Sequence, residues 1–575
     1  ILISLFLTFF LNIYPWCISS AQSKFPHGII LISLDTLRAD HLGIYGYHRN
    51  TSPSIDAFAR ESIVFERAVV QAPWTLPSHM SIMTSLYPSF HKVLSKNNHL
   101  ADEHVTLAEL LRERGYQTAA FADGAVMKEI FGFNQGFDIY DSDSMIGIAR
   151  ILPRVKKWID ENKSKPFFLF IHCYDIHAPY DPPPPYDNIF HDFTYSGHLF
   201  PNPKTLVAAT NNWLKVNDED LRHIVAHYDG GIRYTDAKIG EFLSYLQETG
   251  LKDQTLIIIT SDHGEEFREH GGFLHWKLYF KPNLHVPLIM RIPNYPKEEV
   301  RINELVQSID ILPTILDIAG FPPHKRAQGR SLFPLIKRYK NIFNRSLWRI
   351  FHPFRKKEII SFSESTEHPF FPWYKDDISV MTDVYQMIYN TKTHSTQLFN
   401  LRADPLEKNN IARVNKEVTE HLLSQYRELD SITPNHKTLP ITLDDQTREQ
   451  LKALGYIGDT EKKPVCLGDL DCDGVPDSND RCPQIPNGSD LGTCIDCNTG
   501  NIGGTCKKSE DCETGNICSM NQENVCDDDL DGDGILNSED NCPCITNPNQ
   551  ENTYPPGGNH CGDACDCIGN LDKDG

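Results

Sequence analysis

The stretch Gly28-Ile29-Ile30-Leu31-Ile32-Ser33-Leu34-Asp35 decides how this 575-residue sequence is interpreted, because it joins a continuous apolar run to an aspartate. Short apolar runs are typical of strands buried on both faces of a parallel sheet. Further runs follow at 167–171, 256–259 and 287–290. Helix-like stretches alternate with them, as at 107–114 and 236–249. The pattern predicts an α/β fold in which a mostly parallel sheet is flanked by helices.

Chemically active side chains follow three of these runs. Asp35 ends the first, the histidine-containing segment 172–177 follows the second, and Asp262-His263 comes shortly after the third. Catalytic groups of such sheets gather at the carboxyl ends of the strands, so we expect these residues to lie at one edge. Singly, each can equally be a capping aspartate or a buried core histidine. Together, their oxygen and imidazole ligands suit a divalent cation.

Several spaced motifs resemble those of the sulfatase family, within the alkaline phosphatase superfamily, and they occur in the same order. The motifs are LDTLRADHLG at 34–43, TLPSH at 75–79, DIHAPY at 175–180, SDHGE at 261–265 and HWK at 275–277. Further landmarks are VPLI at 286–289, DILPTIL at 310–316, GRSL at 329–332 and LFNL at 398–401. The resemblance covers residues 28–459. It implies a sulfatase-like catalytic domain at 26–340 and a smaller C-terminal α+β subdomain at 341–460.

The resemblance also implies roles for individual residues. One divalent cation, expected to be Ca²⁺ with Mn²⁺ and Zn²⁺ as alternatives, is implied with the ligands Asp35, Thr75, Asp262 and His263. His177 or His275 is implied as the proton donor to the leaving oxygen, a role that the pKa of histidine suits. Substrate binding is implied for Arg38, His79 and Lys277, of which Lys277 is also a catalytic candidate.

Thr75 departs from the pattern of the family. Most sulfatases carry Cys or Ser there and convert it to formylglycine, and threonine is not a substrate for that conversion. A threonine hydroxyl can still attack directly when a bound metal lowers its pKa. Other branches of the superfamily, including phosphodiesterases and phosphoethanolamine transferases, use threonine in this way. We therefore predict an unmodified, metal-bound Thr75 as the nucleophile and expect no formylglycine.

His79 is the second departure, because it stands where the family has arginine. Arginine is permanently charged, whereas histidine is mostly neutral at pH 7, so the pocket loses positive charge. This favours a singly charged group, such as a sulfate monoester or a phosphodiester, over a phosphate monoester. We expect a small-molecule or glycan ester of sulfuric, phosphoric or phosphonic acid as the substrate.

Three hypotheses about function follow from these residues. The first is an exported, metal-dependent ester hydrolase of the sulfatase family with Thr75 as nucleophile. The second is a transferase that passes a phospho-group to an alcohol through a Thr75 adduct. The third is an inactive family member that acts as a surface binding or adhesion protein. Retention of Asp35, Asp262 and His263 argues against the third, since binding alone does not require that set.

Charge and cysteine are concentrated in the last part of the chain. Residues 464–575 hold 14 of the 16 cysteines and 23 acidic against 4 basic residues, so they carry −19 of the net charge of −22. A nearly neutral body and an acidic tail offer no basic surface for a phosphate backbone, which argues against nucleic-acid binding. Dense cysteines favour disulfides in an oxidising compartment over a zinc site.

An internal repeat in this tail resembles thrombospondin type 3 repeats. Residues 469–483 align with residues 529–543, and alternate aspartates followed by glycine are typical of oxygen-ligand calcium loops. The predicted Ca²⁺ ligands are Asp469, Asp471, Asp473, Asp477, Asp480, Asp529, Asp531, Asp533, Asn537 and Asp540. We expect the tail to serve in cell-surface or matrix attachment, and a disordered acidic spacer is the alternative.

The first 23 residues contain no charged side chain and begin with an apolar run at 1–11. Small residues at 19–21 suit signal-peptidase cleavage after Ala21, so we interpret 1–23 as an incomplete signal peptide. A lipid anchor on Cys17 is the alternative. The protein is therefore expected to be exported, as a secreted, periplasmic or cell-surface protein. Both ends of the sequence resemble truncations of a longer chain.

Overall fold

The computed structural model describes residues 26–453, except 143–145, 198, 212, 276–278, 296, 341–357, 365–375 and 435–438, and the backbone of three tail strands. The described residues divide between two compact units, one within Ile1–Phe193 and Arg222–Gly458, the other within Thr194–Leu221 and Asp459–Gly575. No helix among the described residues has the length and apolar character that crossing a membrane requires.

A nine-stranded sheet forms the centre of the first unit, in the order β11-β2-β10-β7-β1-β6-β4-β5, with β12 also paired to β2. Its strands are β1 (Gly28–Leu34), β2 (Ile63–Val69), β4 (Gln117–Phe121), β5 (Ile139–Asp141), β6 (Phe167–Cys173), β7 (Thr255–Thr260), β10 (His285–Arg291), β11 (Val300–Ile302) and β12 (Val306–Gln307). β1 is parallel to both β6 and β7, whereas β10 is antiparallel to β7 and β2. The predicted mostly parallel sheet is confirmed.

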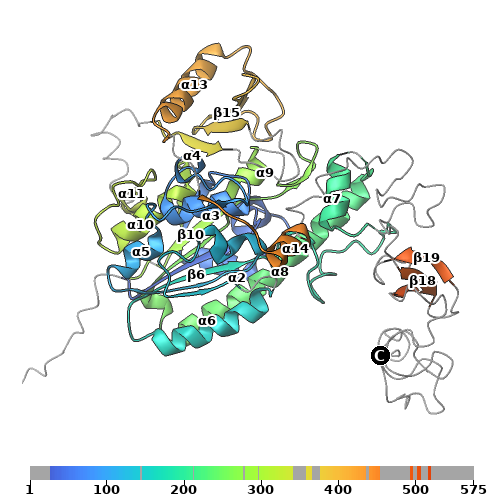
Figure 1. Ribbon diagram of the computed structural model, residues 1–575, viewed down its shortest axis with the longest axis horizontal. Coiled ribbons are helices and arrows are strands. Elements are labelled where there is room, and N and C mark those ends of the chain that lie inside the picture. The colour runs from blue at the N-terminus through green and yellow to red at the C-terminus, as the bar shows by residue number, and fades with distance from the viewer. Residues whose placement is uncertain are drawn as a thin grey trace, which may run out of the picture. The chain divides into compact units, whose positions relative to one another are not determined.

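Helices cover both faces of this sheet. Figure 1 shows α2, α6 and α8 on one side and α3, α5 and α10 on the other. On the latter side, Leu31 and Phe170 of the sheet share a core with Met80 of α3, Leu111 of α5 and Ile315 of α10. Over both units, the α-helices of the described residues are α2 (Pro53–Ala59), α3 (Thr75–Thr84), α4 (Pro88–His91), α5 (Leu107–Arg112), α6 (Ile148–Asn162), α7 (Pro203–Thr210), α8 (Asp218–Glu248), α9 (Lys281–Leu284), α10 (Ile311–Ile318), α11 (Phe333–Lys340), α13 (Lys416–Ser431) and α14 (Asp445–Ala453).

α8 begins well before the helix that the sequence predicts at 236–249. Gly230 and Gly231 lie inside it and make that stretch resemble a loop in sequence. A Cβ atom at Gly230 would lie 2.4 Å from the backbone oxygen of Tyr186, and one at Gly231 would lie 3.1 Å from that of Asp175. The glycines therefore serve close packing of a neighbouring segment on the helix, and the helix continues through them.

A second, antiparallel sheet forms the smaller C-terminal subdomain, in the order β13-β14-β15-β16. Its strands are β13 (Ser361–Glu364), β14 (Asp377–Met381), β15 (Tyr385–Asn390) and β16 (Thr396–Asn400). Val380 and Leu398 of this sheet share a core with Leu422 of α13. Short pairs join β3 (Asn98–His99) to β17 (Leu439–Pro440) and β8 (Glu266–Phe267) to β9 (Phe273–Leu274).

The described part of the tail is one antiparallel sheet in the order β19-β18-β20. Its strands are β18 (Gly492–Asp496), β19 (Ile502–Cys506) and β20 (Asn516–Ser519). The predicted signal peptide and all ten predicted Ca²⁺ ligands of the tail lie outside the described residues.

Candidate active site

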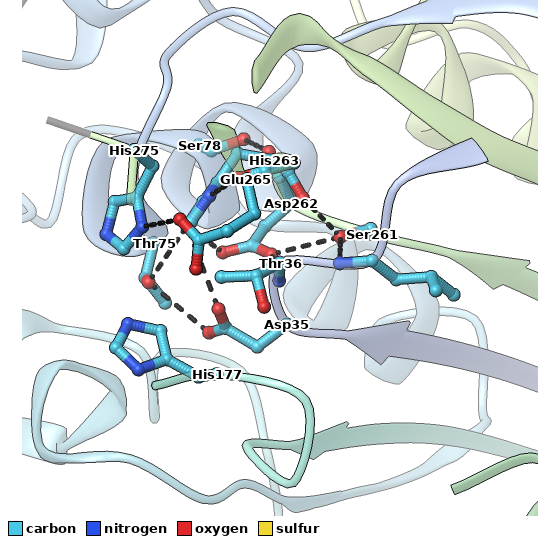
Figure 2. Close-up of polar contacts among 12 residues, drawn as sticks. Asp35, Thr36, Thr75, Ser78, His177, Ser261, Asp262, His263, Glu265 and His275 are labelled. Carbon is cyan, nitrogen blue, oxygen red and sulfur yellow. Dashed lines mark hydrogen bonds and ion pairs between the residues drawn. The ribbon is translucent and has the colours of Figure 1, made fainter. Parts of the chain in front are cut away.

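Three neighbouring strands bring the predicted site residues to one sheet edge. β1 lies between β6 and β7, and Ser33 of β1 is in register with both His172 and Thr260. Asp35 therefore emerges beside the end of β6, where its backbone N–H donates to the Cys173 carbonyl at 3.1 Å. Asp262 and His263 follow β7 at the same edge, and Figure 2 shows the three side chains converging.

Asp35, Asp262 and His263 form a buried set whose ligand atoms all lie within 4.8 Å of one another. His263 Nε2 is 3.2 Å from Asp262 Oδ2 and 3.7 Å from Asp35 Oδ1. These two carboxylate oxygens are buried and have no hydrogen-bond partner. Because His263 Nδ1 donates to the Gly264 carbonyl at 2.9 Å, Nε2 is the ring nitrogen that faces them. Unsatisfied oxygens facing a ring nitrogen fit a divalent cation.

The electrostatics of the two carboxyl groups agree with this fit. Burial and the nearby Asp262 raise the pKa of Asp35 to about 6. Burial also acts to raise the pKa of Asp262, but the imidazoles of His263 and His79 outweigh it and lower that pKa to about 2. Two buried carboxylates this close resist joint ionisation, and a bound cation would reverse that effect.

Thr75 is the first residue of α3, and its hydroxyl borders this set. Thr75 Oγ1 donates to Asp35 Oδ2 at 3.3 Å and lies 3.3 Å from His263 Nε2. The side chain is fully buried. Because it stands at the N-terminus of a ten-residue helix, the positive end of the helix dipole favours negative charge on this oxygen.

His79 lies one turn after Thr75 on α3, and both of its ring nitrogens have protein partners. Nδ1 donates to the Thr75 carbonyl at 2.9 Å, and Nε2 accepts from the Ser33 hydroxyl at 2.9 Å. Burial lowers the pKa of His79 to about 3, so the ring is neutral as the sequence predicts. In this arrangement the ring nitrogens hold the first turn of α3 against β1, whereas the sequence predicts that they bind substrate.

The guanidinium of Arg38 is likewise occupied by protein groups. Nε and Nη2 each donate to a carboxylate oxygen of Asp40 at 2.9 Å. Nη1 donates to the Glu265 carbonyl at 2.9 Å and to Glu269 Oε1 at 2.6 Å. The side chain is buried. Its charge is thus balanced by two carboxylates, although the sequence predicts a contact with substrate.

His177 and His275 face the same side of the cluster. The His275 ring centroid lies 4.3 Å from that of His263 and 5.2 Å from that of His177. Figure 2 shows the hydroxyl of Thr75 between these two histidines in the view. Burial lowers the pKa of His275 to about 3 and that of His177 well below its usual value. Lys277, the remaining catalytic candidate, lies outside the described residues.

Two further polar residues of the site receive no role from the sequence. His172 Nε2 lies 3.1 Å from Asp35 Oδ2, and its Nδ1 donates to the Asp123 carbonyl at 2.8 Å. Burial opposes protonation of His172, but the bond to Asp35 outweighs it and raises its pKa. Glu265 Oε1 lies 3.0 Å from His275 Nδ1. The register of β6 against β1 places His172 beside Asp35, so this residue could have been found from the predicted sheet. The contact between Glu265 and His275 could not, because it depends on the tertiary fold.

Fold and site together define an alkaline-phosphatase-like hydrolase, in which a hydroxyl stands beside two carboxylates and an imidazole at the edge of a mostly parallel sheet. Residues 27–321, about half of the chain, match the family described as Sulfatase. The chain belongs to the sulfatase family.

Known proteins support this placement along most of the body. Arylsulfatase K of Rattus norvegicus is 25% identical over 435 residues, which cover 66% of this chain and 73% of that protein. Delta 4,5-hexuronate-2-O-sulfatase of Bacteroides thetaiotaomicron is 21% identical over 472 residues, covering 75% and 95%. The phosphonate monoester hydrolase of Agrobacterium radiobacter superposes with a TM-score of 0.56 at 20% identity, covering 76% of this chain and 99% of that structure.

Two further family matches concern the C-terminal parts. Residues 268–431 match the family described as N-sulphoglucosamine sulphohydrolase, C-terminal. Residues 457–489 and 524–550 match the Thrombospondin type 3 repeat, which confirms the repeats that the sequence predicts in the tail.

Proposed function

We propose that the protein is a metal-dependent ester hydrolase in which unmodified Thr75 attacks the sulfur or phosphorus atom of the substrate. The observation that carries this proposal is the position of Thr75 Oγ1, 3.3 Å from both Asp35 Oδ2 and His263 Nε2. A nucleophile must lie within reach of the groups that accept its proton and lower its pKa. The N-terminus of α3 adds a positive dipole at the same oxygen.

Asp35, Asp262 and His263 are the residues that would hold the cation, and a bound divalent cation supplies positive charge that favours the alkoxide and neutralises ester oxygens. The chain's own groups handle the protons. As Thr75 Oγ1 forms its bond to sulfur or phosphorus, its proton has Asp35 Oδ2 as acceptor. Burial lowers the pKa of His275 and His177 in the free protein, and an anionic ester group bound beside them raises it again, so that one imidazole can hold a proton and the ester oxygen of the alcohol leaves with it. Water then gives a proton to that imidazole and attacks the sulfur or phosphorus atom of the Thr75 adduct. Thr75 Oγ1 leaves with the proton held by Asp35, which releases sulfate or the phosphorus acid and restores the hydroxyl.

Glu265 supports the role of His275 as proton donor. Its carboxyl oxygen lies 3.0 Å from Nδ1 of the imidazole, and both side chains are buried. This bond fixes the orientation of the ring, because a second hydrogen bond at Nδ1 leaves Nε2 for the leaving oxygen. Glu265 therefore acts as a positioning residue for the acid, without contact to substrate.

We propose a sulfate ester of a glycan or small molecule as the substrate, with a phosphoric or phosphonic ester as the alternative. The related enzymes include a hexuronate-2-O-sulfatase, and the superposed structures include a phosphonate monoester hydrolase. Among the described site residues, His79 is neutral and the charge of Arg38 is balanced by Asp40 and Glu269. A site with this little positive charge suits a singly charged ester group.

We further propose that the protein is exported and that its thrombospondin type 3 repeats bind Ca²⁺ and attach it to a cell surface or matrix. The repeats match that family at both predicted positions, and their alternating aspartates suit oxygen coordination. Another relative is a putative extracellular sulfatase Sulf-1 homolog of Caenorhabditis elegans, 28% identical over 371 residues, 56% of this chain and 51% of that protein.

The test compares the full-length protein with two variants on aryl sulfate, bis-aryl phosphate and aryl phosphonate esters, in the presence of Ca²⁺, Mn²⁺ or Zn²⁺. Thr75→Ala should lose at least about 1,000-fold in kcat, since it removes the nucleophile. Thr84→Ala is the matched control, because Thr84 is a buried threonine of the same helix that bonds only to the Met80 carbonyl in the described structure. Equal activity of Thr75→Ala and wild type refutes the proposal. Products formed with an added alcohol separate hydrolysis from transfer.

A further inference from the structure

A second group of metal-ligating side chains lies away from the candidate active site, where the proline-rich segment after His177 meets α8. His223 and His227 are four residues apart on α8, so they share one face of the helix. Their ring centroids are 4.6 Å apart. His191, from the segment that follows the prolines, places its ring centroid 5.5 Å from that of His223.

These separations match the geometry of a shared metal ion. A tetrahedral zinc binds imidazole nitrogen at roughly 2.0–2.1 Å, which places the centroids of two bound rings roughly 5 Å apart. The observed distances of 4.6 and 5.5 Å lie on either side of that value. Two histidines in the i, i+4 positions of a helix, with a third from another segment, form a common zinc-binding arrangement.

Buried polar atoms at this place point to a missing partner. Nδ1 of His227 and Oδ1 of Asp187 are buried and have no hydrogen-bond partner. His227 also forms a hydrogen bond to the backbone of Tyr180, which therefore uses Nε2 and leaves the lone pair on Nδ1. A metal-binding histidine is usually held in this way, through its other ring nitrogen.

We propose that His191, His223, His227 and Asp187 form a second metal site, which binds Zn²⁺ or a similar transition-metal ion. Three imidazoles and one carboxylate select such an ion over Ca²⁺, which prefers oxygen ligands. In the described residues, the Asp35 set alone has all its ligand atoms within 4.8 Å, so the second site closes by rotation of its rings. His227 Nδ1 and Asp187 Oδ1 have no hydrogen bond to lose when the site closes, although Asp187 Oδ2 accepts from the Asn188 side chain at 3.0 Å. The terminal torsion of a histidine side chain is soft.

A bound ion would clamp the segment from Asp187 to His191 onto α8. This helix also contacts the first motif, because the Tyr228 hydroxyl donates to the Thr36 carbonyl at 2.7 Å.

The experiment counts zinc per chain in the full-length protein after equilibration with Zn²⁺ and excess Ca²⁺, followed by dialysis. The double variant His223→Ala/His227→Ala should contain one zinc fewer than wild type, whereas Asp262→Asn should keep it. Zinc held by the tail or by the catalytic set contributes equally to the double variant and to wild type. The control His48→Ala/His421→Ala removes two exposed imidazoles and should leave the count unchanged.

A second measurement keeps the test decisive if the double variant folds poorly. His191→Ala changes only the loop ligand, and it should weaken zinc binding at least about tenfold. Cobalt titration of this variant should lose the visible absorption of a tetrahedral site that wild type shows. Equal zinc counts in wild type and both variants, with unchanged cobalt spectra, overturn the proposal and leave three histidine rings in edge-to-face contact.

Discussion

The exchange Glu265→Gln is expected to slow the cleavage of esters with poor leaving groups and to spare those with good ones. Glu265 Oε1 holds Nδ1 of His275 at 3.0 Å in a buried setting. Glutamine keeps the size of the side chain but replaces the carboxyl group that orients the ring with an amide. An alkoxide is a poor leaving group, so cleavage of an alkyl ester requires a well-placed His275 that protonates the leaving oxygen. A nitrophenolate leaves readily without a proton, so its ester does not require this acid.

The hydrogen bond between these two residues sets the magnitude. Burial raises the pKa of Glu265 to about 8 and lowers that of His275 to about 3, so at pH 7 this hydrogen bond joins two neutral groups in the free protein. Such a bond contributes about 0.5–1.5 kcal/mol, which corresponds to about 2- to 13-fold in rate if it is needed in the transition state. We expect kcat/KM to fall within this range for alkyl or unsubstituted phenyl esters, and to stay unchanged for nitrophenyl esters. The loss should appear in kcat, because Glu265 does not contact the substrate.

The assay measures kcat/KM of wild type and variant for a series of esters that differ only in the leaving group. Glu266→Gln is the matched control: Glu266 is a neighbouring buried glutamate whose Oε1 accepts from the backbone of His270 and Gly272. Its exchange should affect all esters alike. Bound metal is counted in each variant, since Glu265 stands close to His263 in sequence. Equal rate losses across the series for Glu265→Gln would refute the positioning role.

Three further outcomes are expected. Asp262→Asn removes one of two carboxylates from the predicted cation set and should weaken binding of the active-site cation at least tenfold in calorimetric titration, whereas unchanged affinity contradicts the ligand set. Burial raises the pKa of Glu364 to about 7 in the folded chain from an ordinary value of 4.5. The native state then holds the proton more tightly, so the urea midpoint should fall as pH rises from 4.5 through 7, and Glu364→Gln should flatten this dependence; identical profiles exclude the effect. Gly230→Ala should lower the free energy of unfolding by about 1–3 kcal/mol, because its Cβ would lie 2.4 Å from the Tyr186 carbonyl oxygen, and unchanged stability would contradict that close approach.

The sheet and the convergence of Asp35, Asp262 and His263 could be predicted from sequence because both depend on one-dimensional patterns. A continuous apolar run marks a strand buried on both faces, and parallel strands end at the same edge. The direction of β10 has no such signal, since an apolar run reads alike in both directions. The predicted start of α8 is wrong because Gly230 and Gly231 make the sequence resemble a loop. In the structure they lie inside the helix and allow a neighbouring segment to pack closely against it.

The partners of individual polar side chains depend on tertiary contacts far apart in sequence. The position of Arg38 in the first motif favours a substrate contact, yet its guanidinium pairs with Asp40 of the same motif and with Glu269, which is distant in sequence. Nothing in the sequence around His79 indicates that its Nε2 accepts a hydrogen bond from the Ser33 hydroxyl. The pairing of Glu265 with His275 likewise forms because the β8–β9 hairpin returns the chain to the site.

The central claim is that Thr75 itself carries the group transferred from the substrate, and one measurement tests it most directly. The full-length enzyme is quenched with acid during turnover, and the peptide that contains Thr75 is analysed by mass spectrometry. The account predicts an unmodified Thr75 in the resting enzyme and, during turnover, the added mass of one sulfo or phospho group on that residue. A transferred group on another residue, or a modified Thr75 in the resting enzyme, would contradict the account.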